Sequence, residues 1–545
     1  MLLSATLSNQ YQRYHYDYVI VGAGSAGSVL ANRLSADCSK RVLLLEAGGS
    51  DGGLFSSMPA GFARFMHSAK HNWLFRSLPT TDSTVSKGHY TPRGKMLGGS
   101  SAMNAMIYTR GAPSDYDQWA QQGCEQWGYQ QLLPYFIRSE GNQHIHDAYH
   151  GNDGPLKVSR QQPFYPVSQQ FLAACAEAGI APNPDFNGAQ LAGSGAFQFT
   201  INNGQRCSAY KAYVKPIRKR ENLSILKECL VERVVFSGKR ATGVCFQRAG
   251  QRFIAAAEKA VILSAGTFQS PAILERSGIG SSKRLHRLGI ECLVDNPNVG
   301  ENLQEHVDIC LHYRNAAKDG LTLTPWGLLK LTPALLQYLT RRSGQLAHSL
   351  AETGAFLRSS DSVETPDIQL HLLPVMFNDS GYDWWPTLQH GFTCHVCLLR
   401  PQSRGCSHID SNRASAKPRI DYQFLQTAQD RQRLAQGVRQ AHSIISQPAL
   451  AKHNGGALWD IDALTDAQLF EGLRARAGLI YHPVGTCKMG VDDSAVVDPS
   501  LRVKGTEKLY VVDASIMPTI ISGNTNAPTI AIAEKGADII TADAH

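Results

Sequence analysis

The sequence lacks a run of apolar residues long enough to cross a membrane. Every apolar stretch is interrupted before it reaches the roughly 18 residues that a spanning helix needs. The segment before the first predicted strand, MLLSATLSNQYQRYHY, also lacks the basic start and sustained apolar stretch of a secretory signal. We therefore expect a protein that is neither transmembrane nor exported.

Closely spaced cysteines and concentrated charge are also scarce. The twelve cysteines lie far apart, which suits free thiols in a reducing compartment better than a disulfide framework, so we expect a cytoplasmic location. The net charge is +8, but the densest basic cluster, Lys215–Asn222, contains no aromatic residue and no nucleic-acid motif. We interpret it as a solvated helix end and expect no nucleic-acid partner.

The length and composition are those of an ordered globular enzyme. The 545 residues exceed what one hydrophobic core usually covers, which predicts two domains or one large interleaved α/β body. Apolar residues make up 43% and charged residues 18% of the chain, as in ordinary globular proteins.

The first motif is an apolar strand that runs into three glycines in GxGxxG spacing. The run Tyr18–Val21 leads into Gly22, Gly24 and Gly27, and a helical pattern follows at once. The first glycine permits a tight turn, the second lets a pyrophosphate approach the backbone, and the third lets helix and strand pack closely. The N-terminus of the helix attracts the negative charge of that pyrophosphate.

A second apolar strand, RVLLLEAG, ends in Glu46 about twenty residues after the last glycine. A carboxylate there can accept hydrogen bonds from both ribose hydroxyls of adenosine and disfavours the 2′-phosphate of NADP. The motif leaves NAD and FAD open, although the extra glycines in EAGGSDGG favour FAD. We expect Ser25, Ala26 and Ala47 to belong to the same nucleotide site.

Further motifs resemble the glucose-methanol-choline (GMC) family of FAD-dependent oxidoreductases, within it most closely bacterial choline dehydrogenases and aliphatic alcohol dehydrogenases. They are RGKMLGGSSAMNAMIYTRG, AGTFQSPAILERSGIG, VGENLQEH, YHPVGTCKMG and VVDASIMPTIISGNTNAPTIAIAEKGAD. The resemblance spans almost the whole chain. It implies an α/β fold in which a Rossmann-like FAD-binding domain is interleaved with an α+β substrate domain built on an antiparallel sheet.

The resemblance also implies which residues contact the cofactor. LGGSS presents a backbone without large side chains to a flat ring or a diphosphate. Asn104 resembles a flavin-contacting position, with a turn asparagine as the alternative. Some relatives carry a histidine bonded covalently to the flavin, but this chain has Met103 there, which predicts non-covalent FAD. The implied contacts are Gly98, Gly99, Ser100, Asn104, the backbone of Val231, Ala265, Gly266, Asp513 and Ala514.

IYHPVGTCKMG contains a histidine for which the residues alone leave three roles open. His482 could be a base, because a neutral imidazole with a pKa of about 6.5 accepts protons near neutral pH. It could also be a buried core histidine, or a metal ligand together with Cys487. No second pair of ligands occurs at zinc spacing, and Cys394 and Cys397 point to opposite faces of one predicted strand. We therefore predict no metal site.

The resemblance favours the catalytic role for His482. The last motif predicts a helix that begins at Asn526, and a helix start carries unpaired N–H groups and partial positive charge. In the family a His or Asn there pairs with the motif histidine, so we predict His482 and Asn526 as the catalytic pair. His482 would take the hydroxyl proton while the α-hydride passes to flavin N5, and both residues would hold the developing alkoxide.

Cofactor motifs occur at both ends and in the middle of the sequence, so we expect interleaved domains. The predicted FAD-binding domain comprises residues 1–160, 201–310 and 476–545. The predicted substrate-binding domain comprises residues 161–200 and 311–475. In the latter, PDIQLHLLP alternates leucines and isoleucine with Gln369 and His371, which predicts a strand of an antiparallel sheet with one buried face. The resemblance implies that this sheet roofs the flavin.

Two further stretches carry proline. Ser270-Pro271 predicts a helix start, with the end of the helix at Gly278. Leu321–Arg342 is apolar for its length and ends in two arginines. It could be an interfacial helix on a membrane, a substrate-domain helix or a dimer contact, and its two prolines are expected to break it up.

The leading functional prediction is FAD-dependent oxidation of a primary alcohol, aliphatic or choline-like, to the aldehyde, with a quinone-type electron acceptor. An oxidase that reduces oxygen is an alternative that the motifs do not separate. A hydroxynitrile lyase that keeps FAD as a structural part, and a non-catalytic FAD-binding protein, are the others. The predicted location is the cytoplasm, with peripheral contact to the inner face of the membrane as a second interpretation.

Overall fold

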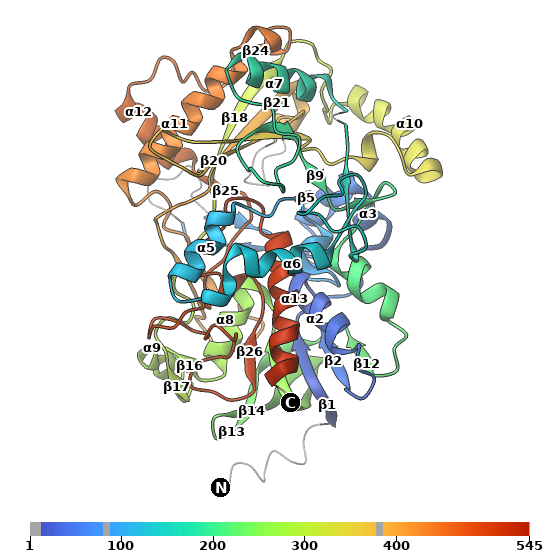
Figure 1. Ribbon diagram of the computed structural model, residues 1–545, viewed down its shortest axis with the longest axis vertical. Coiled ribbons are helices and arrows are strands. Elements are labelled where there is room, and N and C mark those ends of the chain that lie inside the picture. Colours follow the sequence, from blue (N-terminus) through green and yellow to red (C-terminus); the bar gives the residue numbers. More distant parts are fainter. Residues whose placement is uncertain (1–11, 80–87, 163, 378–384, 544–545) are drawn as a thin grey trace.

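The computed structural model describes residues 12–79, 88–162, 164–377 and 385–543. Two seven-stranded sheets dominate it, one in the lower and one in the upper half of Figure 1. Each sheet has its own hydrophobic core. The site described below lies between them.

The lower sheet has the order β12-β2-β1-β15-β14-β13, with β26 paired to β15. Parallel pairing of β1 with β2 places Tyr18 opposite Val42, and β1 is also parallel to β15. Helices α2 and α13 pack together beside this sheet, so the first and last helices described are neighbours (Figure 1). The elements are β1 (Gln12–Val21), α2 (Ser25–Leu34), β2 (Val42–Leu45), β12 (Leu223–Leu226), β13 (Leu230–Ser237), β14 (Arg240–Arg248), β15 (Gln251–Leu263), β26 (Leu509–Val511) and α13 (Asn526–Asp543).

The upper sheet is antiparallel, in the order β24-β18-β21-β20-β19-β8, with β25 paired to β18. Helix α11 packs against β20 and β21, α7 against β19 and α12 against α11, so helices cover one face. The elements are α7 (Pro166–Glu177), β8 (Gly193–Ala196), β18 (Val307–Asn315), β19 (Thr353–Leu357), β20 (Ile368–Leu373), β21 (Gly391–Leu398), α11 (Ala428–Ile445), β24 (Asn454–Ala457), α12 (Asp466–Arg476) and β25 (Gly478–Leu479).

Smaller elements connect and flank the two sheets. They are α3 (Gly53–Ser57), η2 (Pro59–Phe62), α4 (Ala63–Met66), β3 (Phe75–Arg76), β4 (Tyr90–Thr91), η3 (Gly99–Ala102), β5 (Ile107–Tyr108), α5 (Pro113–Gln121), η4 (Glu125–Trp127), α6 (Tyr129–Ser139), β6 (Glu140–Asn142), β7 (Leu156–Arg160), β9 (Gln198–Phe199), β10 (Ile201–Asn202), β11 (Gln205–Arg206), η5 (Tyr210–Val214), η6 (Lys215–Ile217), α8 (Gly266–Arg276), β16 (Ile279–Gly280), α9 (Ser282–Arg287), β17 (Val294–Asp295), α10 (Pro325–Arg341), η7 (Gln345–Ala347), η8 (Trp385–Leu388), β22 (Cys406–His408), β23 (Arg419–Asp421), η9 (Pro448–Leu450) and η10 (Ala514–Ile516).

The strand predicted from PDIQLHLLP exists as β20, but both of its faces are buried, whereas one buried face was predicted. Gln369 and His371 are as buried as the aliphatic residues that alternate with them. The aliphatic side packs under α11, and the polar side faces the interior between the two sheets. The alternation of aliphatic and polar residues therefore marks two buried faces, one apolar and one polar.

Proline has a different position in two helices from the one predicted. Helix α8 begins at Gly266, so Pro271 lies inside it and not at its start. Helix α10 is one continuous helix, with Pro325 in its first turn and Pro333 in its interior, so the prolines do not break it up. Within the part of the chain that the structure describes, no helix combines the length and apolar character needed to span a bilayer.

Candidate functional site

A cavity of about 350 Å³ lies between the two sheets, and segments far apart in the sequence line it. All but two of the predicted cofactor residues contribute to its wall; Gly27 and Gly98 do not. The predicted residues in the wall are Gly22, Gly24, Ser25, Ala26, Glu46, Ala47, Gly99, Ser100, Asn104, Val231, Ala265, Gly266, His482, Asp513, Ala514 and Asn526.

The glycine motif leaves no room for side chains where two loops meet. Gly22 has φ 100°, and a Cβ on it would lie 2.5 Å from the carbonyl oxygen of Ser264. A Cβ on Gly27 would lie 1.8 Å from the oxygen of Gly22, and one on Gly99 would lie 2.7 Å from Cα of Gly24. The bare backbone of both loops thus borders the cavity.

The N-terminus of α2 fits the diphosphate of a dinucleotide. No side chain caps this helix, which follows Gly24 directly, so its first N–H groups remain available to an anion. Ser25 and Ala26 of this turn line the cavity. The donors and the open backbone together fit FAD.

Glu46 has the geometry expected of a ribose-binding acid. Its two carboxylate oxygens accept hydrogen bonds from the backbone N–H groups of Ala23 (2.9 Å) and Gly48 (2.8 Å). Because each carboxylate oxygen has a second lone pair, the carboxylate can accept further bonds. Burial raises the pKa of Glu46 to about 7, although the backbone hydrogen bonds oppose this shift.

Asp513 organises the opposite wall of the cavity. One oxygen accepts from Gly266 N (2.8 Å) and Ser270 Oγ (2.6 Å), and the other from the backbone N and Oγ of Ser515. The buried carboxylate therefore ties the start of α8 to η10. Its four bonds are all internal, and Ala514 beside it lines the cavity.

His482 projects into the cavity from a loop that is held from both sides. Its backbone N–H donates to Glu305 Oε1 at 2.6 Å. The hydroxyl of Thr267 donates to the carbonyl of Pro483 (2.7 Å), and the hydroxyl of Thr486 donates to the carbonyl of Thr267 (2.5 Å). That carbonyl is available because the residue four positions later is a proline without an N–H.

The hydrogen bonds of the two neighbouring histidines determine the tautomer of His482. His306 Nε2 lies 3.0 Å from the carbonyl oxygen of Ile521, which can only accept, so Nε2 of His306 carries the proton. In a neutral His306, Nδ1 is then an acceptor, and the 3.0 Å contact between the two Nδ1 atoms requires His482 Nδ1 to donate. His482 Nε2 is left unprotonated, with a lone pair that faces the cavity side.

Both imidazoles are neutral in this arrangement. Burial lowers the pKa of His306 to about 4. Burial, followed by the neighbouring His306, His371 and Arg93, lowers the pKa of His482 well below its usual value. His482 is therefore a proton acceptor throughout the neutral range.

The partner of His482 is Asn524, and the predicted pairing with Asn526 is wrong. Asn524 Nδ2 lies 3.0 Å from His482 Nε2, and its Oδ1 accepts from Thr109 Oγ1, which fixes the orientation of the amide. Asn526 lines the cavity, but its Oδ1 accepts from Ser25 Oγ at 2.7 Å. The sequence offers two asparagines two positions apart, and the helix that begins at the second one turns it towards α2.

Two charged residues that the sequence analysis did not single out, one buried and one half-buried, support the His482 loop. Glu305 lies beneath the loop, and burial raises its pKa to about 8 although Arg93, 3.9 Å away, opposes the shift. Arg93 also donates to the carbonyl of Tyr481 (2.9 Å). Both residues belong to the recognised motifs, so their positions in those motifs were the available signal.

The polar face of the upper sheet forms the roof of the cavity. His371 of β20 and His395 of β21 line it, and burial lowers the pKa of His371 to about 3. His395 Nδ1 lies 2.7 Å from the carboxylate of Asp308, and the Cys397 thiol donates to the same carboxylate at 3.1 Å. Cys394 lies on the other side of β21, in the core under α11.

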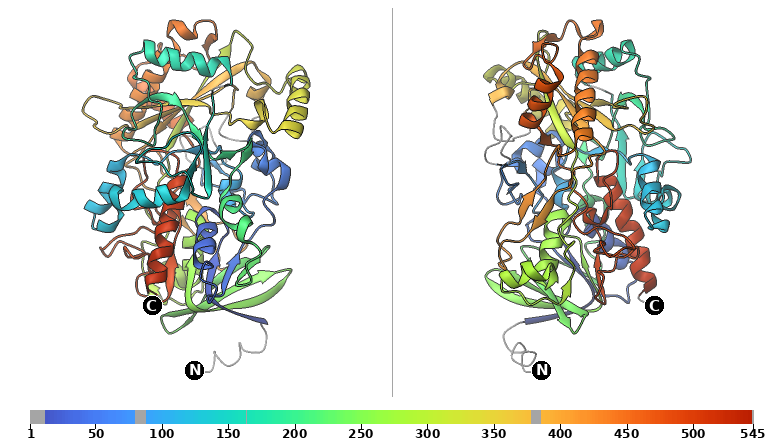
Figure 2. Two further views of the ribbon diagram at one scale, coloured as in Figure 1. Left: turned by 45° about the vertical axis from the view of Figure 1, so that its right-hand side comes forward. Right: turned by 90° about the vertical axis from the view of Figure 1, so that its left-hand side faces the viewer.

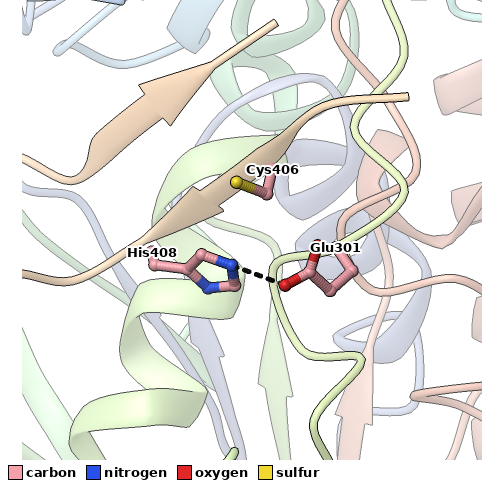
Figure 3. A group of neighbouring side chains, drawn as sticks. All are labelled: Glu301, Cys406 and His408. Carbon is pink, nitrogen blue, oxygen red and sulfur yellow. Dashed lines mark hydrogen bonds and ion pairs between the residues drawn. The ribbon is translucent and has the colours of Figure 1, made fainter. Parts of the chain in front are cut away.

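Glu301, Cys406 and His408 form a group whose ligand atoms could hold a metal ion (Figure 3). His408 contacts Glu301 at 2.9 Å and Glu275 at 3.0 Å. Arg284 pairs with both of these carboxylates. The carboxylates already have cationic partners from the protein, so this group gives no reason to revise the prediction that the chain binds no metal.

Comparison with known proteins gives the family. Models of the GMC oxidoreductases match residues 16–308 and 401–533. The chain is 42% identical over 533 residues to "Alcohol dehydrogenase [acceptor]" of Pseudomonas putida, covering 96% of this chain and 95% of the relative. It is 42% identical over 539 residues to mitochondrial choline dehydrogenase of Homo sapiens, covering 97% and 90%.

Solved structures agree with the assignment to this family. Pyridoxine 4-oxidase from "Mesorbium loti" superposes with a TM-score of 0.87 at 31% identity, covering 96% of this chain and 98% of that one. A formate oxidase variant from Aspergillus oryzae RIB40, studied for its FAD modification, superposes with a TM-score of 0.89 at 25% identity, covering 97% and 98%. The predicted family, α/β fold class and FAD cofactor are confirmed, and the chain belongs to the GMC oxidoreductases, a family of FAD-dependent enzymes.

Proposed function

We propose that this enzyme oxidises the hydroxyl group of a primary alcohol to an aldehyde, with His482 Nε2 as the base. The observation that carries the proposal is the hydrogen-bond chain from Ile521 through His306 to His482, which leaves Nε2 unprotonated. Removal of the hydroxyl proton needs such an acceptor within hydrogen-bond reach. The chemistry that FAD supplies when bound is acceptance of the α-hydride of the substrate at N5.

Asn524 and His482 would hold the substrate oxygen together. Before proton transfer, Asn524 Nδ2 lies at hydrogen-bond distance from Nε2. A substrate hydroxyl that displaces the Asn524 amide from Nε2 gives its proton to Nε2 and accepts a bond from the displaced amide. After transfer, the imidazolium and the amide both donate to the developing alkoxide, which stabilises the charge where it forms. His482 then carries two protons, and its Nδ1 still donates to His306.

The residues of the wall support a non-covalent cofactor. Met103, where some relatives have the attached histidine, lines the cavity with a thioether that forms no covalent flavin bond. We propose that Gly24, Ser25 and Ala26 hold the diphosphate and Glu46 the adenosine ribose. Acid precipitation of the purified enzyme should release all flavin to the supernatant; yellow colour in the pellet would contradict non-covalent binding.

The proposed substrates are aliphatic or choline-like alcohols, and the proposed acceptor is a quinone. Relatives named for alcohol and choline oxidation support the substrate class, and the first of these is named for a separate acceptor. We propose a cytoplasmic enzyme that contacts the membrane peripherally. We also propose residues 1–160, 201–310 and 476–545 as the FAD-binding domain, and 161–200 and 311–475 as the substrate domain.

The test is anaerobic mixing of the FAD-loaded enzyme with a panel of alcohols that includes choline. Bleaching of the flavin absorbance by an alcohol is expected. His482→Ala should slow bleaching by about 10²–10⁴-fold while FAD stays bound, and His482→Gln serves as the variant of similar size. An oxidised spectrum with every alcohol, together with consumption of a cyanohydrin, would mean a lyase instead.

The oxidase alternative differs only in the fate of the electrons. Hydrogen peroxide formed under air at the rate of alcohol consumption would identify an oxidase. Turnover that needs a quinone or dye, with little peroxide, is the expected result.

A further inference from the structure

Exposed apolar side chains gather at one edge of the molecule. Helix α10 carries Leu329, Leu335, Leu336 and Leu339 on one side, and Leu336 is 64% and Leu329 61% exposed. On the opposite side of the helix, the residues that face inwards, of which Gly327 is the first and Tyr338 the last, are half-buried or buried. In Figures 1 and 2, α10 lies at the outer edge of the molecule with α3 below it.

Two neighbouring segments extend this apolar surface. Tyr338 of α10 packs with Met58, which follows α3, and α3 carries the exposed Phe55. The residues before α10 bond to η8, because Thr322 Oγ1 donates to the carbonyl of Thr387, and η8 begins with the exposed Trp385. We name this surface the α10 face, comprising Phe55, Leu329, Leu335, Leu336, Leu339 and Trp385.

The charge of the segment that contains α10 has one sign, although Asp51 precedes α3 and Asp379 and Asp383 precede η8 in the sequence. The sequence contains no Asp or Glu between Asp319 and Glu352, whereas Arg341 and Arg342 end the helix. On the α3 side, Arg64 and Lys70 are exposed. Leucines flanked by arginines and an aromatic residue match a helix that lies in a membrane interface, where long cationic side chains reach the lipid headgroups.

A second copy of the chain fits this surface less well. In a two-fold dimer the same face meets itself, so the arginines at the end of α10 would approach those of the other copy. Residues 320–351 contain no acid that could pair with them. An anionic lipid surface supplies the missing negative charge.

The segments of the α10 face continue directly into the wall of the cavity. Phe62 and Met66 follow α3, Leu350 and Ala351 follow α10, and Phe377 precedes η8; all line the cavity. An apolar molecule that leaves the lipid near this face would therefore meet an apolar part of the cavity wall.

We propose that the α10 face rests on the surface of a lipid bilayer that contains anionic lipid, and that the lipid-soluble acceptor approaches the cavity from this side. The docking specifies the peripheral membrane contact proposed above, and the second part also rests on the proposed quinone acceptor. Docking places the leucines among the upper acyl chains and the arginines at the headgroup phosphates.

The test is flotation of the full-length, FAD-loaded protein with vesicles of phosphatidylcholine, alone or with phosphatidylglycerol. The wild type should float with the phosphatidylglycerol vesicles and less so at high salt. Leu329→Gln/Leu336→Gln and, separately, Arg341→Gln should each lower the bound fraction, the leucine pair by about tenfold. Val491→Gln is the matched control, because Val491 is 61% exposed but lies beside Gly123, away from the α10 face.

Turnover of a water-soluble alcohol with a water-soluble dye should be equal in all variants, which separates docking from the proposed chemistry. Failure of the wild type to float on either vesicle would overturn the docking proposal even if the enzyme oxidises alcohols. So would a wild type that is a dimer in sedimentation velocity and becomes a monomer with Leu329→Gln/Leu336→Gln, because the face would then join two copies.

Discussion

Substitution of Asn524 gives the sharpest test of the site, because the structure and the sequence pattern select different asparagines. Asn524 Nδ2 lies 3.0 Å from His482 Nε2, whereas Asn526 bonds to Ser25. Asn524→Ala should slow reduction of bound FAD by the alcohol. Asn526→Ala should mainly weaken FAD binding.

The magnitude follows from the charge that the Asn524 amide would stabilise. Removal of one donor to a developing oxyanion reduces turnover by about 10²–10³-fold. Loss of the neutral bond from Ser25 to Asn526 costs about 1 kcal/mol, or roughly fivefold in affinity. The two variants should therefore differ by at least about tenfold in the rate of flavin reduction.

The assay is anaerobic stopped-flow reduction at saturating alcohol, with each variant loaded with FAD beforehand and its flavin content measured. The pH dependence of the rate should keep its shape in Asn524→Ala, because the tautomer of His482 is fixed by His306 and not by the amide. If Asn526→Ala reduced more slowly than Asn524→Ala, the assignment of Asn524 as the oxygen-holding residue would be wrong.

Three more predictions concern the surrounding structure. Gly27→Ala would bring Cβ to 1.8 Å from a backbone oxygen of the motif, so we expect apoprotein of lower thermal stability, measured by flavin content and melting temperature. Burial alone would lower the pKa of His150, but its hydrogen bonds to Asp185 and Glu140 outweigh the effect of burial and raise the pKa to about 9. Protonated His150 therefore stabilises the fold fully below its unfolded pKa of 6.5 and loses this effect as pH rises through 9; urea unfolding of His150→Gln should show a weaker decline over that window. Thr267→Val removes the hydroxyl bond to the His482 loop, and turnover should fall by about tenfold with flavin content unchanged, whereas an unchanged turnover would mean that the loop needs no such support.

The sequence predicted the parts of the site that backbone geometry fixes locally. Gly22 and Gly27 of the GxGxxG motif are glycine for steric reasons, and the helix, the second strand and Glu46 follow within a short stretch, so the pattern can be recognised from the sequence alone. The choice between Asn524 and Asn526 could not be made from the sequence, although the start of α13 at Asn526 was predicted, because Asn526 bonds to Ser25 at the other end of the chain.

The family resemblance implied that the upper sheet roofs the flavin, but the burial of the polar side of β20 was not predicted, for a related reason. Gln369 and His371 alternate with aliphatic residues just as they would on a solvent-facing strand. Only the packing of one sheet over another turns this polar side inward, and a single sequence contains no sign of that packing. The role of Pro271 could not be predicted for the same reason. Because Pro271 has no N–H, the carbonyl of Thr267 accepts a hydrogen bond from Thr486, which lies far along the chain.

The neighbouring positions of the first and last helices have a consequence for biosynthesis. Helix α2 packs against α13, and β26 adds to the sheet beside β15. His482, Asp513, Asn524 and Asn526 all line the cavity and are translated long after the glycine motif. The glycine motif leaves the ribosome early, but its binding site is incomplete until these residues follow. We therefore expect that the cofactor is not retained until the chain has been made and folded at least as far as Asn526.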